Sequence, residues 1–264
     1  MDDSVNIVAS GYDAFYTTWD QSPTLSALWR EHVTGPDFPE EYQHISFLRL
    51  RELEALCDVL DLSRGATLAD LACGSGGPGL WVAKRCEARL IGIDASAVAV
   101  QRATERARGL GMAASAAFRL GTFADTGLDA ASIDGVISVD AIQYSPDVAR
   151  AFAEIARIIR PGGTLAFVAF ELDAERVAGL PVWCDPVGDY TPFLASAGFE
   201  ILQYDQLPGW RDQVMAGFSE VIAAQSALRA ELGLEAAEAL VAEATITVEL
   251  QPYSGHVLAV ARRP

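Results

Sequence analysis

The chain has 264 residues, of which 51% are apolar and 21% charged, so it can bury a full hydrophobic core and is not an intrinsically disordered protein. Its 36 acidic and 19 basic residues give a net charge of −17, which repels phosphate backbones and anionic lipid headgroups. Nucleic acid and membrane partners are therefore not expected.

The four cysteines form no C-x-x-C pair and have no nearby histidines, so neither a metal site nor a disulfide framework is predicted. The start "MDDSVNIVAS" lacks the basic and apolar regions of a signal peptide. No apolar run reaches membrane-spanning length. These observations predict a cytoplasmic protein with reduced thiols.

Residues 1–64 predict a helical cap. Apolar residues recur at helical spacing within "ISFLRLRELEALCDVLDL", and Gly65 follows this segment as a break. Five of them share one predicted helical face: Ile45, Leu48, Leu53, Leu56 and Leu60.

From residue 66 onward, short apolar segments alternate with helical patterns, which is typical of a parallel sheet covered on both faces. We predict seven strands: "TLADLA", "RLIGID", "AAFRLG", "DGVISV", "TLAFVAF", "GFEILQYD" and "HVLAVARR". Ser96 is expected to cap the helix that ends at Gly109, and Ser145 is expected to begin the next helix. That helix carries an apolar stripe of Val148, Phe152, Ile155 and Ile159 before "PGG" stops it.

A short helix is expected at 189–197, between the fifth and sixth strands. A further helical pattern, "RDQVMAGFSEVIAAQSALRAELG", precedes the last strand and predicts an insert that covers the substrate. We therefore expect a single domain over 1–264. It divides into a cap (1–64), a cofactor-binding core (65–206), a helical lid insert (207–250) and the last strand (251–264).

A glycine-rich loop follows the first predicted strand. In "CGSGGPG", Gly74, Gly76 and Gly79 have the G-x-G-x-x-G spacing, which is a weak signal when it stands alone. Asp94 ends the second predicted strand 20 residues after Gly74, where a carboxylate can accept hydrogen bonds from ribose hydroxyls. A dinucleotide and S-adenosylmethionine both fit this pattern.

Asp70 lies within the first predicted strand, where a dinucleotide-binding fold ordinarily has an apolar side chain. A buried carboxylate needs a cationic or hydrogen-bonding partner. S-adenosylmethionine offers an ammonium group and a sulfonium centre, whereas a dinucleotide offers pyrophosphate. Asp70 therefore favours S-adenosylmethionine, although a carboxylate that only binds loop amides is the alternative.

Four segments in succession, "LADLACGSGGPG", "IGIDAS", "GTFADTGLDAASIDGVISVDAIQYSPD" and "RIIRPGGTLAFVAFE", resemble the ordered motifs of class I S-adenosylmethionine-dependent methyltransferases. The similarity covers roughly residues 40–205. It implies a Rossmann-like α/β fold with a seven-stranded, mostly parallel sheet whose last strand is antiparallel. The cofactor is then expected across the ends of the first, second and fourth strands.

The resemblance also assigns cofactor contacts by position. The ribose is expected at Asp94 and Ala95, and the adenine near Gly121, Thr122 and Phe123, although relatives often have an acidic residue where this chain has Thr122. A second departure is Ala72 in place of the usual glycine, from which no loss is expected. The methionine part is expected along Asp70, Ala72, Cys73, Gly74, Ser75 and Gly76.

The methyl acceptor is expected beside the end of the fourth strand, where Asp140 and Gln143 can contact cofactor or substrate. The cap supplies Tyr12 and Tyr16 as lid contacts. Candidate catalytic groups are Asp140, His32, His44 and Tyr16, because carboxylate, imidazole and phenol groups can move protons. An apolar acceptor pocket is expected from Trp183, Tyr190, Trp210 and Phe218.

The predicted function is methyl transfer from S-adenosylmethionine to an oxygen, nitrogen or carbon atom of a small molecule. A nicotinamide-dependent oxidoreductase and a non-catalytic protein of the same fold are the alternatives. A homodimer is possible, and no bound metal is predicted.

Overall fold

The protein forms one seven-stranded sheet in a computed structural model that describes residues 13, 16 and 21–264. The strand order is β3-β2-β1-β4-β5-β7-β6, and β1 to β5 pair in parallel. The last strand, β7, runs antiparallel to both of its neighbours, which confirms the predicted fold class. The strands are β1 (Thr67–Leu71), β2 (Arg89–Asp94), β3 (Ala116–Leu120), β4 (Ile133–Val139), β5 (Ile159–Leu172), β6 (Glu200–Gln206) and β7 (Ser254–Arg262).

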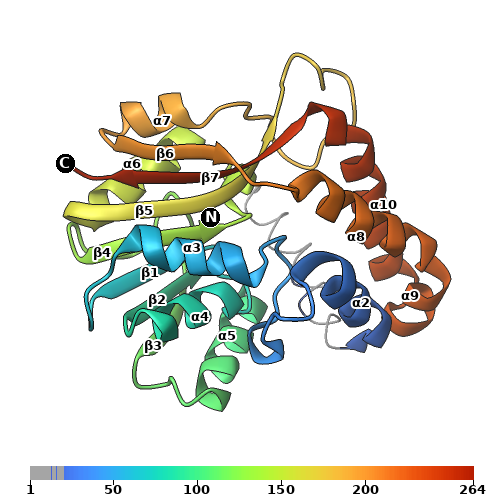
Figure 1. The fold of residues 1–264 in the computed structure, drawn as a ribbon, viewed down its shortest axis with the longest axis horizontal. Helices are drawn as coiled ribbons and strands as arrows, with labels where there is room; N and C mark the ends of the chain where they lie inside the picture. Colours follow the sequence, from blue (N-terminus) through green and yellow to red (C-terminus); the bar gives the residue numbers. More distant parts are fainter. Residues whose placement is uncertain (1–12, 14–15, 17–20) are drawn as a thin grey trace.

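Helices cover both faces of the sheet and extend beyond one end of it (Figure 1). The cap contains α2 (Pro23–Leu28), η2 (Trp29–Thr34), η3 (Glu40–Tyr42) and α3 (Leu50–Leu60). The core adds α4 (Gly77–Arg85), α5 (Ala97–Gly109), η4 (Ile142–Tyr144), α6 (Val148–Ile158) and α7 (Thr191–Ser196). The insert consists of α8 (Trp210–Ala223), α9 (Gln225–Leu232), α10 (Leu234–Leu250) and η5 (Gln251–Tyr253).

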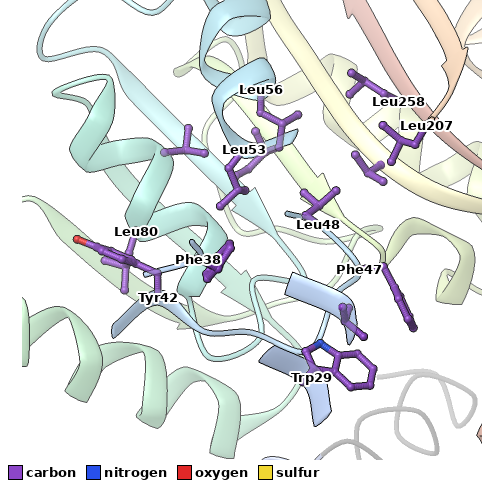
Figure 2. Packing of buried hydrophobic residues seen from close by; sticks show 14 of the residues in the cluster. Trp29, Phe38, Tyr42, Phe47, Leu48, Leu53, Leu56, Leu80, Leu207 and Leu258 are labelled. Atoms are coloured by element: carbon purple, nitrogen blue, oxygen red, sulfur yellow. The ribbon is translucent and has the colours of Figure 1, made fainter. Parts of the chain in front are cut away.

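Two hydrophobic clusters stabilise this arrangement, one on each face of the sheet. The first joins α3 and α4 to the cap, and Figure 2 shows Leu53 and Leu56 of α3 beside Leu48. The second joins α6 and α7 to the opposite face, where the predicted stripe from Val148 to Ile159 is buried as expected. The central strands β1, β4, β5 and β7 are buried on both faces, which explains why they do not alternate with polar residues, whereas the edge strands β3 and β6 are largely exposed.

Two predicted helix starts are wrong. The cap helix begins at Leu50, because the Glu52 carboxylate accepts the main-chain N–H of Arg49 at 2.8 Å and so marks the first turn. Ile45 and Leu48 therefore precede the helix. The α6 helix is capped by Asp147, not Ser145, because the Asp147 carboxylate accepts the N–H of Arg150 at 2.9 Å.

The "PGG" segment also differs from its prediction, because β5 continues through it. The main-chain N–H of Gly162 donates to the carbonyl of Arg263, and the N–H of Arg263 donates to Gly163. The helix before it ends at Ile158, so Ile159, which the sequence assigns to the helical stripe, is the first residue of β5. The predicted Ser96 cap of α5 is confirmed, because its hydroxyl accepts the N–H of Ala99.

The predicted helical insert consists of three helices, with breaks at Ala224 and Gly233. Gly233 has a φ of +83°, a conformation that glycine adopts without steric cost. The insert packs on the cap: the buried Gln213 amide of α8 donates to the carbonyls of Val33 (2.8 Å) and Phe47 (2.6 Å). Cap and insert thus form one continuous roof, while the division of the chain into four parts stays a prediction.

No helix in the described part of the chain combines the length and the apolar character that crossing a membrane requires.

Candidate active site

A cavity of about 1140 Å³ opens where β1, β2 and β4 end, beneath the roof of cap and insert. We call its two parts the cofactor half and the acceptor half, after the ligands that the sequence analysis expects there, and define each by its lining residues. The cofactor half is lined by the strand-end turns, with Asp70, Cys73–Ser75, Asp94–Ala95 and Gly121–Phe123. The acceptor half is lined by the cap, the β5 end and the insert, with Phe47, Phe170, Trp183, Phe218, Leu240, Glu243 and Ile246.

Most residues predicted for the site line this cavity. The exceptions are Gly76 and His32, while Tyr12 lies outside the described residues. The predicted residues that line it are Tyr16, His44, Asp70, Ala72, Cys73, Gly74, Ser75, Asp94, Ala95, Gly121, Thr122, Phe123, Asp140 and Gln143.

The glycine loop brings main chain to the cavity through a run of left-handed residues. Ala72, Gly74 and Gly76 have φ values of +56°, +52° and +81°. A Cβ on Gly74 would lie 2.6 Å from the Tyr16 hydroxyl oxygen, so only glycine fits against the tyrosine. Gly76 is a correction to the predicted cofactor contacts: a Cβ there would meet Ala103 and Phe118, so this glycine permits the α4–α5 packing and does not face the cavity.

Ala72 carries a steric cost that the sequence reasoning missed. A left-handed conformation brings the Cβ of a non-glycine residue too close to its own carbonyl oxygen, at roughly 1–2 kcal/mol. A glycine at this position would avoid this cost, so the expectation that Ala72 causes no loss stays a prediction that the backbone conformation bears on.

Asp94 is held in place by the glycine loop. Its Oδ2 accepts the N–H of Gly74 at 2.8 Å, and its Oδ1 accepts the N–H of Ser96 at 2.9 Å. Each carboxylate oxygen keeps a further lone pair, and the side chain lines the cavity. The geometry suits an acceptor of two hydroxyl hydrogen bonds.

Asp70 is buried on the same side of the cavity, and its Oδ2 has no hydrogen-bond partner. A Cβ on Gly79 would lie 2.2 Å from that oxygen, so the glycine makes room for the carboxyl. Burial, together with the negative charge of Asp94, raises the pKa of Asp70 to about 8. An unpaired buried carboxyl of this kind fits a cationic ligand group, and a pyrophosphate would add to the repulsion.

Asp140, a predicted catalytic group, already uses both carboxylate oxygens. Oδ1 lies 2.6 Å from the Nε2 of His256, and Oδ2 accepts the N–H of Phe47 at 2.7 Å. Its φ of +51° keeps it in the left-handed region. His256 is fully buried and stacks on Phe170 with ring centroids 4.2 Å apart. Asp140 therefore joins the cap to β7, while it also lines the cavity, and its catalytic role stays a prediction.

His44 lines the cavity as a neutral hydrogen-bond donor, which corrects its predicted role as a base. Its Nδ1 accepts the N–H of Ser46 at 3.1 Å and lies 2.7 Å from the Ser46 hydroxyl oxygen. The hydrogen must then reside on Nε2, a buried atom that has no partner. Burial lowers the pKa of His44 to about 3, so the ring is uncharged at neutral pH.

His32 is the second correction among the predicted bases. It lies in η2, outside both cavities, with its Nε2 4.0 Å from a Glu31 carboxylate oxygen. Tyr16 does line the main cavity and also borders a smaller one of about 180 Å³. That second cavity carries Arg102 and Arg106 and shares His44 and Ser75 with the first.

At the far end of the cofactor half, Thr122 forms a small turn. Its hydroxyl oxygen accepts the N–H of Asp125 at 3.1 Å, which leaves its hydrogen free to be donated. Gln143 is buried near Asp140, donates to the Asp140 carbonyl at 2.7 Å, and keeps its side-chain oxygen unpaired. Both polar groups can bind a ligand in the cavity.

The predicted acceptor pocket is half right. Trp183 and Phe218 line the cavity, but Tyr190 is buried on the opposite sheet face and donates to the carbonyl of Phe170. Trp210 is buried against the His256 ring. Sequence reasoning missed Phe47, Phe170 and Glu243; the signal for the last was a lone acid among apolar residues in "ALVAEATI".

No cluster of metal-binding side chains, counted as three or more histidine, cysteine or acidic residues, occurs among residues 13, 16 and 21–264.

Comparisons with known proteins agree with this geometry. Residues 69–167 match the family described as "Methyltransferase domain". The chain is 28% identical to the 27-O-demethylrifamycin SV methyltransferase of Amycolatopsis mediterranei, over 98% of this chain and 97% of that protein. The aligned region includes the cap and the insert, which the family match does not reach.

Two solved structures show the same fold. The [4+2]-cyclase SpnF has a TM-score of 0.77 and 22% identity, over 97% of this chain and 95% of that chain. The geranyl diphosphate C-methyltransferase from Streptomyces coelicolor A3(2) has a TM-score of 0.61 and 20% identity, over 81% of this chain and 79% of that chain. The architecture therefore supports more than one chemistry, and the residues of the site must decide among them.

Proposed function

We propose that this chain, which belongs to the class I S-adenosylmethionine-dependent methyltransferases and methylates a small molecule, acts on a hydroxyl group of a bulky and largely apolar acceptor. The observation that carries the proposal is the continuity of one cavity from the strand-end turns into an aromatic chamber under the roof. A volume of about 1140 Å³ exceeds the roughly 300–1,000 Å³ of ordinary small-molecule pockets, so it suits a cofactor and an acceptor together.

The cofactor half has the polarity that S-adenosylmethionine requires. The carboxylate of Asp94 suits the ribose hydroxyls, and the unpaired carboxyl of Asp70 suits the ammonium group. The Nε2–H of His44, beside Arg102 and Arg106 in the adjoining cavity, suits the methionine carboxylate. Thr122 and Phe123, the remaining predicted residues of this half, are proposed to contact the adenine.

When bound, S-adenosylmethionine supplies an electrophilic methyl group on a sulfonium centre. The protein's own task is to orient the nucleophile and exclude water. Asp140 serves this task as a positioning residue, because its two bonds fix Phe47 over the end of β4. Phe47 in turn packs against Phe170 and Phe218, with centroid distances of 5.6 and 5.3 Å, which gives the chamber an apolar aromatic lining.

The charges along the cavity disfavour an anionic acceptor. Among the described residues that line it, Arg150 is the one arginine or lysine, against six acidic side chains. The six are Asp70, Asp94, Asp125, Asp140, Asp147 and Glu243. Raised pKa values keep Asp70 and, in part, Glu243 protonated at neutral pH, but the other four acids still outnumber Arg150. A diphosphate would lack sufficient counter-charge among them, so the acceptor is expected to be neutral or cationic.

The relative that aligns over nearly the whole chain is named for a methyl transfer to an oxygen of a rifamycin, which supports an oxygen acceptor here. The same alignment supports methyl transfer over the nicotinamide-dependent and non-catalytic alternatives. A homodimer, a cytoplasmic location and the absence of a nucleic-acid partner stay predictions.

The test is a transfer assay followed by mass spectrometry. The protein is incubated with S-adenosylmethionine and either 27-O-demethylrifamycin SV, as a bulky alcohol, or geranyl diphosphate, as an anionic acceptor. A mass gain of one methyl group on the alcohol, with none on the diphosphate, is the expected result. Methylation of the diphosphate alone would overturn the proposal.

A further inference from the structure

The acceptor half contains one acidic side chain that no other part of the site explains. Glu243 lies in α10 on the helix face that lines the cavity. Its neighbours on that face recur every three or four residues and are small or apolar. They are Ala236, Ala239, Leu240, Ala242 and Ile246.

The other acids of α10 behave differently. Glu235, Glu238 and Glu249 are exposed, and Glu238 lies 3.4 Å from the guanidinium of Arg229. Only Glu243, among the four acids of this helix, lines the cavity. Exposure to solvent, which explains the other three acids, therefore does not explain the position of Glu243 on an apolar face.

Nothing in the described part of the chain neutralises Glu243. Its main-chain carbonyl accepts the Thr247 hydroxyl, but its carboxyl makes no hydrogen bond or ion pair with a described residue. The arginines of the insert are engaged elsewhere: Arg211 donates to the carbonyls of Gln251 and Ser254, and Arg229 pairs with Glu238. Desolvation raises the pKa of Glu243 to about 7, as expected for a carboxyl in an apolar wall.

The opposite wall of this half is aromatic. Trp183 lies between Tyr144 and Phe170, with centroid distances of 5.7 and 6.0 Å, and Phe47 and Phe218 extend the surface. A ligand between the two walls meets apolar surface on both sides and one carboxyl. Glu243 is half-buried, so its carboxyl still meets water in the ligand-free protein. An apolar ligand that fills this half would displace that water, and the unpaired carboxyl would then be costly unless the ligand supplies a hydrogen-bond donor.

We infer that Glu243 is the polar anchor of the acceptor half, and that its carboxyl binds an O–H or N–H donor carried by an otherwise apolar acceptor. The inference rests on the proposed function and deepens it, because it names a chemical group that the acceptor must present. A hydroxyl and a protonated amine both supply that donor, and the test separates them.

The test measures binding of three tricyclic probes with one shared apolar body: dehydroabietylamine, dehydroabietinol and dehydroabietic acid. Each is titrated into protein saturated with S-adenosylhomocysteine, and the quenching of tryptophan fluorescence is followed. The wild type is expected to bind the amine and the alcohol at least about tenfold more tightly than the acid, because a hydrogen bond to a charged group contributes that much.

Variants then assign the effect to Glu243. Glu243→Leu is expected to lose this preference, and Glu243→Gln is expected to weaken the amine by about tenfold while affecting the alcohol less. Glu249→Gln, on the exposed side of α10, is the matched control and should match the wild type. If the wild type prefers only the amine over the acid, the donor of the natural acceptor is an ammonium group. If it prefers only the alcohol over the acid, the donor is a hydroxyl.

Two results would overturn the inference. One is equal binding of the probes by the wild type and Glu243→Leu, and the other is failure of every probe to bind the wild type. Titration of S-adenosylhomocysteine into each variant separates this failure from failure of the proposed function. If cofactor binding is intact and Glu243 has no effect on probe binding, only the inference about Glu243 is contradicted. If the wild type does not bind S-adenosylhomocysteine, the proposed function is contradicted.

Discussion

The cofactor half and the acceptor half of the cavity are built in different ways. The cofactor half depends on main-chain turns at the ends of neighbouring strands, and Asp94 is held there by the N–H groups of Gly74 and Ser96. The acceptor half depends on side chains from segments far apart in the sequence, such as Phe47 in the cap and Phe218 in α8. The first is set by local geometry, and the second by tertiary packing.

This difference decides how the halves respond to substitution. Changes in the cofactor half should alter ligand binding with modest effects on packing. Changes where the roof is joined should alter stability and leave the cofactor turns intact. Four substitutions test this contrast.

The largest effect is expected from Asp94→Ala. The change removes the carboxylate that we assign to the ribose hydroxyls and releases the two loop N–H groups that it accepts. The dissociation constant for S-adenosylhomocysteine should rise by about 100-fold or more, near 3 kcal/mol, in titration calorimetry. Asp129→Ala, an exposed acid outside the cavity, serves as the control. Unchanged affinity in a folded Asp94→Ala protein would remove the assignment.

Asp70→Asn should separate binding from stability within the cofactor half. Because the pKa of Asp70 is raised from 3.8 to about 8, the unfolded chain ionises above pH 4 while the folded protein stays protonated. The cost of the carboxyl is absent below pH 4, grows as the pH rises, and is complete above pH 8. The variant should therefore stabilise the cofactor-free protein by an amount that grows by roughly 1.4 kcal/mol for each pH unit between pH 4 and pH 8.

Urea unfolding at pH 5 and pH 8 measures this effect, with Asp58→Asn, an exposed change on α3, as the control. The same variant should bind S-adenosylhomocysteine more weakly, because the amide no longer balances the ammonium group. A variant that is less stable than the wild type at pH 8 would show that the Asp70 carboxyl is balanced within the protein.

Most residues that the sequence predicts for the cofactor half line the cavity for the same local reason. The spacing of Gly74, Asp94 and Thr122 along the chain follows from strand ends that meet at one edge of a parallel sheet. Spacing along the chain does not specify the hydrogen-bond partners of Asp140 and His44, on which their roles depend. Asp140 meets Phe47 and His256, which lie 93 and 116 positions away. Burial, which sets the charge of His44, also becomes known only once the cap is folded.

The fold followed the same rule. Strand positions and the stripe on α6 could be read from short-range patterns, because each buries a continuous apolar face. The division of the insert into three helices could not, since its breaks at Ala224 and Gly233 depend on how α8, α9 and α10 pack together. Helical periodicity also predicts that the cap helix begins at Ile45. The helix begins at Leu50, and Leu48 is buried in the segment before it, so burial alone produced the apolar pattern there.

Gln213→Leu tests the joint between cap and insert. The substitution leaves two buried carbonyls, those of Val33 and Phe47, without the Gln213 donor. The Val33 carbonyl keeps a second donor, the Arg49 guanidinium at 3.2 Å, so the Phe47 carbonyl is the group left unpaired. An unpaired buried group costs about 1–3 kcal/mol and the leucine recovers part of this by apolar burial, so a net loss of about 1–2 kcal/mol is expected in urea unfolding.

Affinity for S-adenosylhomocysteine should change little in Gln213→Leu, because its contacts lie in the other half. Gln101→Leu, an exposed change on α5, should stay within about 0.5 kcal/mol of the wild type. Equal stability of the two variants would mean that the roof does not depend on this joint.

The smallest effect tests strain in the cofactor half. Ala72→Gly should stabilise the protein by about 1 kcal/mol, because glycine adopts a φ of +56° without the clash of a Cβ, and this gain exceeds the entropy that glycine adds to the unfolded chain. Ala141→Gly is the matched control: this alanine also lines the cavity but has a φ of −133°, so glycine there should destabilise by up to about 1 kcal/mol. Opposite signs for the two variants in urea unfolding would assign the effect to backbone conformation. A destabilised Ala72→Gly would instead mean that the Ala72 methyl group makes contacts that outweigh its strain.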